Sequence, residues 1–324
     1  MKMKSQLAGA GLAAALSACA VGGPAVAGSI TYPGETVGLA LGAPLPEGLY
    51  FVDTGSYSNH RPLAYDSWAF VNIPVIAWST PWTFFGARIE AYAAVPSVNV
   101  GASNYIPPTF VNGVFVPGTN VAVSGIYNPY VNVGLAWDLG NHIGLSQFVG
   151  TYMPISNSLN QNFWVLNSRT ALSYTGDDWD LTAHVIVGIT GNNQGWNGGP
   201  ILIPGGFLLP GGLHTSPDYI NVDLTATKKF DKWEIGLGAF GSSDISGVST
   251  NFNPFYGRQS QIAVGPLVGY NFGPLTVQAY VTRDVYSHNY RNAFGQRVYE
   301  TNLFVRGVVP LWNPPAPAPV VAKY

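Results

Sequence analysis

The chain of 324 residues has very little charge, since Asp, Glu, Lys and Arg together make up 9% of it, whereas soluble globular proteins carry roughly 25%. So few charges cannot cover an ordinary water-exposed surface, which argues against a cytoplasmic enzyme. The balance is also nearly neutral, with a net charge of -2 and a pI near 6.2. That excludes the basic surface with which proteins neutralise phosphates, so we expect no nucleic-acid partner.

Cysteine and long hydrophobic runs are equally scarce. The only cysteine is Cys19, which excludes a disulfide framework. After residue 27, no run approaches the roughly 18 apolar residues of a membrane-spanning helix. Yet 47% of the residues are hydrophobic and 13% aromatic, with 39 glycines and 25 prolines. The chain therefore has enough apolar surface to fold, and disorder is excluded.

The amino terminus has the layout of a secretory signal. Two lysines precede an apolar stretch at 7–21, and a small-residue motif follows that ends at Ala27. This order predicts a signal peptide at 1–27 with cleavage after Ala27. The alternative is lipidation at Cys19, because the four residues ending there resemble a lipobox. The conventional site is preferred because the apolar stretch continues past Cys19.

Beyond the signal, apolar and polar residues alternate with a period of two, which is typical of strands with one oily and one polar face. In 179–190, one parity holds Trp, Leu, Ala, Val, Val and Ile, and the other holds Asp, Thr, His, Ile, Gly and Thr. Twelve segments are predicted as strands, at 48–58, 67–79, 82–96, 124–138, 142–154, 162–175, 179–190, 218–230, 233–242, 260–271, 275–286 and 298–312.

Short and long connections alternate between these segments. After the even-numbered strands the sequence predicts short turns, such as Ser79-Thr80-Pro81 and Asp231-Lys232, whereas most other connections are long and rich in Gly, Pro, Asn and Ser. This is the meander of a bacterial outer-membrane barrel. We therefore predict an all-β fold: a closed antiparallel up-and-down transmembrane β-barrel of about 12 strands over 48–312, with both termini in the periplasm and outer-membrane lipid around it.

Two shorter segments flank the predicted barrel. Residues 28–47 precede the first strand and are expected either in the periplasm or inside the barrel as a plug. Residues 313–324 form a proline-rich tail. The last strand ends at the aromatic Trp312, as the outer-membrane assembly machinery usually requires, so that machinery is an expected partner. The tail after Trp312 departs from the usual terminal signal.

Tryptophans and charges are distributed as a lipid-facing barrel requires. Six of the nine tryptophans are predicted to form a periplasmic aromatic girdle, because they lie beside short turns or at the last strand's end: Trp78, Trp82, Trp137, Trp179, Trp233 and Trp312. Most charges take the polar parity, since an Arg or Lys facing lipid at the midplane costs about 2 to 4 kcal/mol. The expected lumen is lined by Arg88, Glu90, Asn132, Arg169, Asp180, His184, Asp223, Gln278, Glu300 and Arg306.

Several stretches together carry a family resemblance, although no single motif does. They are Ala-Pro-Leu-Pro-Glu-Gly-Leu-Tyr at 43–50, Trp-Asp-Leu-Thr-Ala at 179–183, Phe-Asp-Lys-Trp-Glu-Ile-Gly-Leu-Gly at 230–238, Ala-Val-Gly-Pro-Leu-Val-Gly-Tyr at 263–270 and Val-Pro-Leu-Trp at 309–312. These stretches resemble the outer-membrane transporters associated with the meta-pathway of phenol degradation. The resemblance implies a 12-stranded barrel that passes small hydrophobic or aromatic compounds.

Two non-enzymatic functions remain open. The first is passive uptake of such compounds through a narrow channel, for which mixed charges suit a neutral or weakly acidic solute better than an ion. Aromatic and aliphatic loop residues could then form a capture site above the pore; they include Trp196, Phe207, Leu208, Leu209, Tyr256 and Tyr290. The second is a structural or surface-binding barrel whose lumen is closed by a salt-bridged plug of side chains.

An outer-membrane lipase is the enzymatic alternative, because His142 and Ser146 share a strand parity. The sequence indicates no Asp or Asn that would orient the histidine, as such a site requires. The alternative is that both residues belong to a polar strand face near a turn, and this interpretation is preferred. The five histidines show no metal-ligand spacing. The Gly-x-Gly-x-x-Gly string at 236–241 lies inside a strand pattern and opens no helix. We therefore expect no catalytic residue, metal or cofactor.

Overall fold

The computed structural model describes residues 29–61, 67–106, 109–111, 114–116, 119–155, 162–192, 201–203, 207–209, 214–249, 256–289 and 298–314. The predicted signal peptide and lipobox lie outside these residues, as does most of the predicted tail. All regular structure in the described ranges is β-strand. A search of the same ranges finds no helix with the length and apolar character to cross a bilayer.

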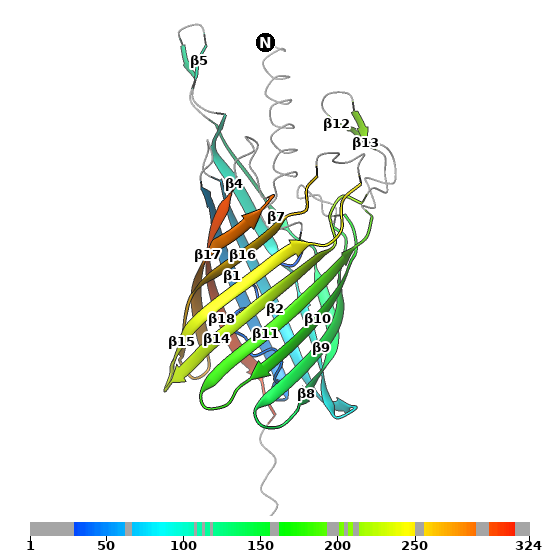
Figure 1. The fold of residues 1–324 in the computed structure, drawn as a ribbon, viewed down its shortest axis with the longest axis vertical. Helices are drawn as coiled ribbons and strands as arrows, with labels where there is room; N and C mark the ends of the chain where they lie inside the picture. The colour runs from blue at the N-terminus through cyan, green and yellow to red at the C-terminus, as the bar shows by residue number, and fades with distance from the viewer. Residues whose placement is uncertain are drawn as a thin grey trace, which may run out of the picture.

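Twelve strands close into one antiparallel barrel (Figure 1). The first strand, β1 (Gly48–Arg61), pairs with β2 (Ser67–Phe84) on one side and with the last strand, β18 (Tyr299–Trp312), on the other. Closure matters because hydrocarbon offers no partner to an unpaired strand edge. The predicted closed antiparallel barrel of 12 strands is confirmed, whereas the periplasmic position of both termini stays a prediction. Between β2 and β18 the wall consists of β3 (Ala87–Ala94), β8 (Tyr130–Asp138), β9 (Ile143–Tyr152), β10 (Val165–Tyr174), β11 (Trp179–Thr190), β14 (Tyr219–Phe230), β15 (Trp233–Asp244), β16 (Ser260–Asn271) and β17 (Thr276–His288).

The third and fourth wall strands continue beyond the others at the end of the barrel that carries the long connections, called here the loop end. There β4 (Ser97–Ile106) extends β3, and β7 (Thr119–Ile126) leads into β8. The sequence predicts one strand at 82–96 and one at 124–138. Both predictions are wrong, because each wall strand is divided into two parts. Two small hairpins follow at this end, β5 (Thr109–Val111) with β6 (Val114–Val116) and β12 (Ile201–Ile203) with β13 (Phe207–Leu209).

Prolines explain why these two strands are interrupted. Pro96 separates β3 from β4, and Pro129 separates β7 from β8; proline has no N–H for the ladder and is found in sheets at edges and bulges. Ala94 is paired with Tyr130, but Ser97 is paired with Ile126, so the register differs by one residue across the break. The strands change direction and twist at such bulges.

The first turn at the opposite end, called here the turn end, lies farther along the chain than predicted. The sequence places it at Ser79-Thr80-Pro81, but β2 continues to Phe84. Phe85 and Gly86 form the turn, with φ of 48° and 75°, as a two-residue hairpin turn requires. β2 passes the proline by a register shift between Ser79 and Thr83. The expected turn is therefore wrong.

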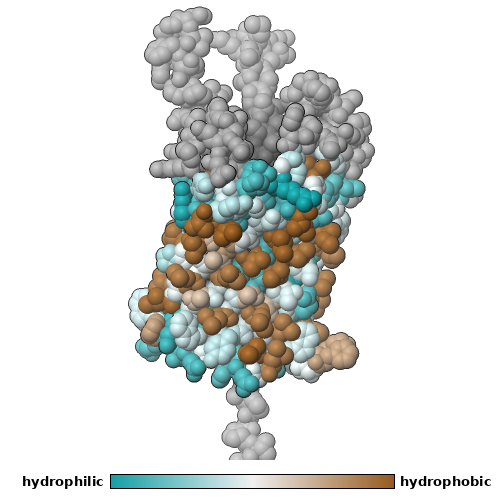
Figure 2. All heavy atoms as spheres, in the orientation of Figure 1, coloured by the Kyte–Doolittle hydropathy of each residue, from teal (hydrophilic) through white to brown (hydrophobic). Residues whose placement is uncertain are grey.

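The outer surface between the two rims is apolar. Leu237 and Val305 point outward with 57% and 48% of their surface exposed. Figure 2 shows apolar residues gathered over the middle of the visible face, with hydrophilic residues above and below them. Few charges take the outward parity, and Asp53 is one of them. Asp53 lies on the outward parity of β1, because its neighbour Thr54 is buried and bonded to the luminal Arg306. The sequence patterns did not single Asp53 out.

Candidate functional site

Residues 29–47, called here the luminal segment, run through the inside of the barrel. The segment folds by successive backbone turns, such as those from Glu35 N–H to the Tyr32 carbonyl (3.1 Å) and from Val37 N–H to the Gly34 carbonyl (3.2 Å). Gly34 has φ of 83°, and a Cβ there would lie 2.6 Å from the Phe240 ring. Both observations require glycine at this turn.

Asp223, on β14, fixes the first half of the luminal segment. One carboxylate oxygen accepts the Gly34 N–H (2.9 Å). The other accepts the backbone N–H and the hydroxyl of Thr36, at 3.0 and 2.6 Å. The Thr36 hydroxyl also lies 2.8 Å from Nδ1 of His184 on β11. Two neighbouring wall strands therefore hold the same turn.

Arg306, on β18, holds this turn from another part of the wall. The residue is fully buried and donates to the carbonyl of Val37 at 2.5 Å and to that of Glu35. It also donates to Oγ1 of Thr54 (2.9 Å) and to the hydroxyl of Tyr280 (3.1 Å). Charged donors make stronger hydrogen bonds than neutral ones. Arg306 is thus a clamp between the wall and the segment.

The second half of the luminal segment is held near the turn end. Glu90, on β3, accepts the Leu45 N–H at 2.8 Å, and Ser79 donates to the Leu45 carbonyl at 2.9 Å. Two strands away from β3, on β9, Ser146 donates to the Leu41 carbonyl at 2.7 Å. Contacts to strands all around the wall show that the segment lies in the lumen.

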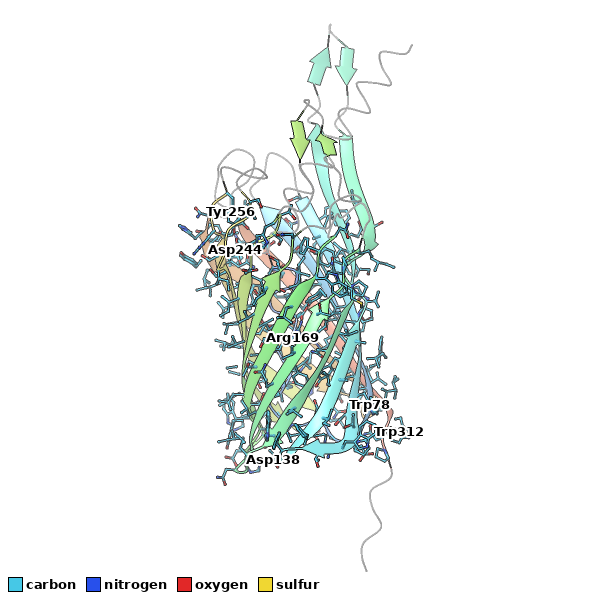
Figure 3. The ribbon with its side chains drawn as sticks, turned by 90° about the vertical axis from the view of Figure 1, so that its right-hand side faces the viewer. Trp78, Asp138, Arg169, Asp244, Tyr256 and Trp312 are labelled. Atoms are coloured by element: carbon cyan, nitrogen blue, oxygen red, sulfur yellow. The ribbon has the colours of Figure 1, made fainter. Side chains whose placement is uncertain are left out.

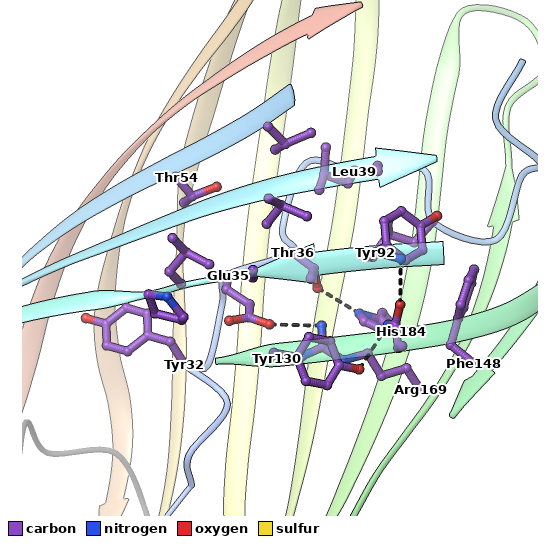
Figure 4. A pocket seen from close by; sticks show the side chains of 18 of the residues that line it. Tyr32, Glu35, Thr36, Leu39, Thr54, Tyr92, Tyr130, Phe148, Arg169 and His184 are labelled. Atoms are coloured by element: carbon purple, nitrogen blue, oxygen red, sulfur yellow. Dashed lines mark hydrogen bonds and ion pairs between the residues drawn. The ribbon is translucent and has the colours of Figure 1, made fainter. Parts of the chain in front are cut away.

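An ion pair joins the segment to the wall at mid-height (Figures 3 and 4). Nη1 of Arg169, on β10, lies 2.9 Å from Oε1 of Glu35. The guanidinium also donates to Asn167 Oδ1 (2.8 Å) and the Tyr152 hydroxyl (3.0 Å), and its carbon lies 4.5 Å from the Tyr130 ring centre. These contacts satisfy the two charges mutually, as burial requires.

The structure places the ten predicted luminal residues on the inner wall, but only six of them contact the luminal segment. Arg88 and Arg169 are partly exposed and the others are buried. Those that contact the luminal segment are Glu90, Arg169, His184, Asp223, Gln278 and Arg306. The others have hydrogen bonds within the wall. Arg88 donates to the Thr80 carbonyl and Asn132 to the Tyr130 hydroxyl. Asp180 accepts from the Thr182 hydroxyl, and the backbone N–H of Glu300 donates to the Asp284 carboxylate. In the described chain, the ion pair with Glu35 takes the place of the expected charge pairs across the lumen.

A cavity of about 240 Å³ lies between the luminal segment and the wall. It exceeds the ~150 Å³ apolar cavity that holds benzene, so one aromatic ring fits. One side is apolar and comes mainly from β2, with Leu39 of the segment facing it: Val52, Val71, Ile73, Val75 and Ala77. The other side is aromatic and polar, with the Glu35–Arg169 pair in it: Tyr92, Tyr130, Phe148 and Tyr152.

The apolar side of this cavity was missed from the sequence. β2 carries buried Val71, Ile73 and Ala77 on its inner face, and outward-facing Phe70 and Ile76 on the other. A strand that is apolar on both faces shows no alternation of polar and apolar residues. The sequence of β2 therefore does not indicate which of its side chains face the lumen. In residues 69–77 both alternating sets of side chains are mainly apolar. This loss of alternation is the sequence signal that indicates an apolar luminal wall.

Of the inward-facing aromatic side chains Tyr92, Tyr280 and Phe304, only Tyr92 lines the cavity. Tyr280 and Phe304 stack with ring centres 4.4 Å apart and pack with Val37 of the luminal segment in a buried cluster. Of the expected loop aromatics, the Tyr256 side chain is described. Its hydroxyl donates to Asp244, and burial together with that carboxylate raises the pKa of Tyr256. The other capture-site side chains lie outside the described residues.

The six predicted girdle tryptophans lie as follows. The five that are exposed and lie at or beside the turn end are Trp78, Trp82, Trp179, Trp233 and Trp312. Figure 3 labels Trp78 and Trp312 there. Trp137 is half-buried, and its indole N–H donates to the Phe85 carbonyl at 3.1 Å. Trp164, which the sequence analysis left aside, is 49% exposed near the start of β10.

The lipase pair does not meet. Ser146 is buried and its hydroxyl is bonded to the luminal segment, whereas His142 is exposed in a turn. Four residues along a strand span about 13 Å, far beyond the hydrogen bond between nucleophile and base that such a site requires. Among the described residues, no group of three or more His, Cys, Asp or Glu could hold a metal ion.

Fold and lumen together define a transmembrane β-barrel of the outer-membrane type with an internal segment. The family described as "Putative MetA-pathway of phenol degradation" matches residues 48–299, and the chain belongs to this family. The search of curated proteins found no match to this chain. Similar solved structures include a Pseudomonas aeruginosa FadL homologue (9% identity, TM-score 0.45, 88% of this chain and 96% of the other). The Pseudomonas putida toluene transporter TodX is 11% identical (TM-score 0.43, 88% and 96% covered).

Proposed function

We propose that this protein is a bacterial outer-membrane channel for the passive uptake of small hydrophobic or aromatic compounds. The observation that carries the proposal is the cavity beside the luminal segment, with an apolar wall on β2 facing a tyrosine-rich wall. Sites for small molecules are concave and mostly apolar, with few polar groups. Family membership supports the same solute class.

The chemistry of the cavity favours an uncharged solute. Its two full charges, on Glu35 and Arg169, are paired with each other at 2.9 Å and bonded to the wall, so they require no counter-charge from a ligand. Tyr92, Tyr130 and Phe148 offer ring edges and faces to an aromatic solute. Val71 and Val75 offer only apolar contact on the other side.

The second candidate is a structural barrel with a closed lumen. The bonds from Asp223, Arg306 and Glu90 to the luminal segment favour it, because the segment crosses the path of a solute. Passage then requires either a route along β2, where the segment leaves the cavity, or movement of the segment. A flux measurement decides between the two candidates.

Filling the cavity tests the proposed channel. Val75→Trp places a large side chain against the apolar wall, and we expect it to reduce the uptake of radiolabelled toluene by about tenfold or more, because the space for the solute is lost. Uptake is measured in lipopolysaccharide-bearing outer-membrane vesicles that contain the full-length protein. Heat-modifiable mobility in gels checks that the barrel is folded.

Ile76→Trp is the matched control. Ile76 is the next residue of β2 and points outward with 41% of its surface exposed, so the same substitution meets lipid and leaves the cavity intact. Uptake through this variant is expected to equal that of the wild type. If the folded wild type passes no toluene above protein-free vesicles, the channel is refuted and the closed barrel stands.

A further inference from the structure

The polarity of two strands inverts where they leave the barrel. In β3, the inner parity holds Glu90 and Tyr92, while the outer parity holds Ile89 and Ala93. Beyond Pro96 the pattern is reversed: in β4 the apolar Val98 faces inward and is buried, while Ser97 and Asn99 take the outer face. A reversal between β3 and β4, which follow each other directly in the wall, means that the surroundings change at Pro96.

The partner strands repeat this arrangement. Val98 is paired with Val71 of β2 and with Gly125 of β7, so the inner face stays apolar or small across three strands. On the outer face, Asn99 is paired with Ser124. Ile126 at the base of β7 is still apolar and exposed. The β4–β7 hairpin therefore has an apolar inner face and an outer face that becomes polar with distance from the barrel.

The level of the inversion matches the edge of the apolar belt. Tyr57 and Phe70 are paired, point outward and are 44% and 45% exposed, and Phe70 is paired with Asn99. Outward aromatic side chains mark the membrane surface in barrels of this type. Beyond this level the hairpin stands above its neighbours at the loop end (Figure 1), where a polar outer face meets water.

The apolar inner face is stable beyond the level of the membrane because Val98 is buried there in a hydrophobic cluster. Val98 and Val71 both line the luminal cavity, and Val100 packs against the same buried cluster. The apolar surface thus continues without interruption from β4 to the cavity. Ile30 of the luminal segment packs in that cluster and marks where the two meet.

We propose that the inner face of the β4–β7 hairpin is the entry surface for the solute: a small neutral hydrophobic molecule binds along Val100 and Val98 outside the membrane and moves along Val71 into the cavity. This inference rests on the proposed channel function and adds the route to it. The polar outer face keeps the hairpin soluble, and the apolar inner face keeps the solute out of water at each step.

A reversible charge on either face tests this route. Cys19 is the only cysteine of the sequence and lies in the predicted signal peptide, so single cysteines can be placed in the full chain as Val100→Cys or Asn99→Cys. The thiolate attacks an anionic methanethiosulfonate reagent, forms a disulfide with its sulfonate-bearing thioalkyl group and releases methanesulfinate. On the inner face this charge interrupts an apolar path, and we expect toluene uptake at low concentration to fall on the order of tenfold. A reductant removes the group and restores uptake, which shows that the barrel stayed folded.

The modified Asn99→Cys protein is the matched control, because its side chain is adjacent in sequence but lies on the outer face. Its uptake is expected to equal that of the unmodified protein. Equal uptake by both modified proteins, while Val75→Trp still blocks the cavity, overturns the entry route and leaves the channel function standing. Loss of uptake in the Asn99→Cys protein as large as in the Val100→Cys protein also overturns it. A wild type without flux removes the channel and the route together.

Discussion

Arg306→Leu is expected to loosen the luminal segment and raise the flux of solutes through the barrel several-fold. Leucine keeps much of the apolar stem but has no donor, so the carbonyls of Glu35 and Val37 lose a charged partner. Each hydrogen bond from a charged group contributes about 1.5 to 3 kcal/mol. We therefore expect the free energy of unfolding to fall by roughly 3 kcal/mol, and single-channel conductance in planar bilayers to increase.

Arg283→Leu is the control for this prediction. Arg283 lies on the neighbouring strand, faces outward and donates to Thr301 on the outer surface, so its loss does not touch the segment. Conductance through this variant should match the wild type. A folded Arg306→Leu barrel with wild-type conductance would contradict the role of Arg306 as a clamp, and would leave Asp223 as the residue that holds the turn.

Val305→Arg is expected to reduce the free energy of unfolding much more than an apolar substitution at the same position. Val305 lies next to Arg306 in β18 but points outward, with 48% of its surface exposed. An arginine on the lipid face near the midplane costs about 2 to 4 kcal/mol, because the bilayer offers the charge neither water nor a partner. An arginine side chain is therefore stable at position 306, inside the lumen, and destabilising at position 305, on the lipid face.

Equilibrium unfolding by urea in lipid vesicles measures this difference. Val305→Leu is the matched control and should change the free energy of unfolding by less than about 1 kcal/mol, since both side chains are apolar. If Val305→Arg costs no more than Val305→Leu, this face of β18 meets water or protein instead of acyl chains. That result would refute the assignment of the outer surface to the membrane.

Some features of this molecule followed from local residue order. Alternation in segments such as 179–190 predicts a strand, and β11 (Trp179–Thr190) has those bounds. The inward position of Asp223 and Arg306 follows from the same parity, because a strand has only two faces. Turn chemistry was a weaker guide: Pro81 suggested a turn, yet a bulge lets β2 continue to Phe84.

Other features depended on contacts between residues far apart in the chain. Glu35 and Arg169 are separated by more than a hundred residues, and no local pattern distinguishes a plug in the lumen from a periplasmic segment. The carboxylate at Asp53 lies on the lipid-facing parity of β1, and strand parity alone offers no reason for it. The continuation of the β4 inner face into the cavity appears only once the neighbours of Val98 are known.

The sequence by itself therefore determined the kind of surface each strand presents and the closed ring that such strands must form, since period-two alternation fixes two faces and hydrocarbon forbids an unpaired edge. Only the tertiary structure decided what fills that ring. The path of residues 29–47, the pairing of Glu35 with Arg169 and the cavity beside β2 arise from packing across the lumen, where partners are chosen by distance in space and not by spacing along the chain.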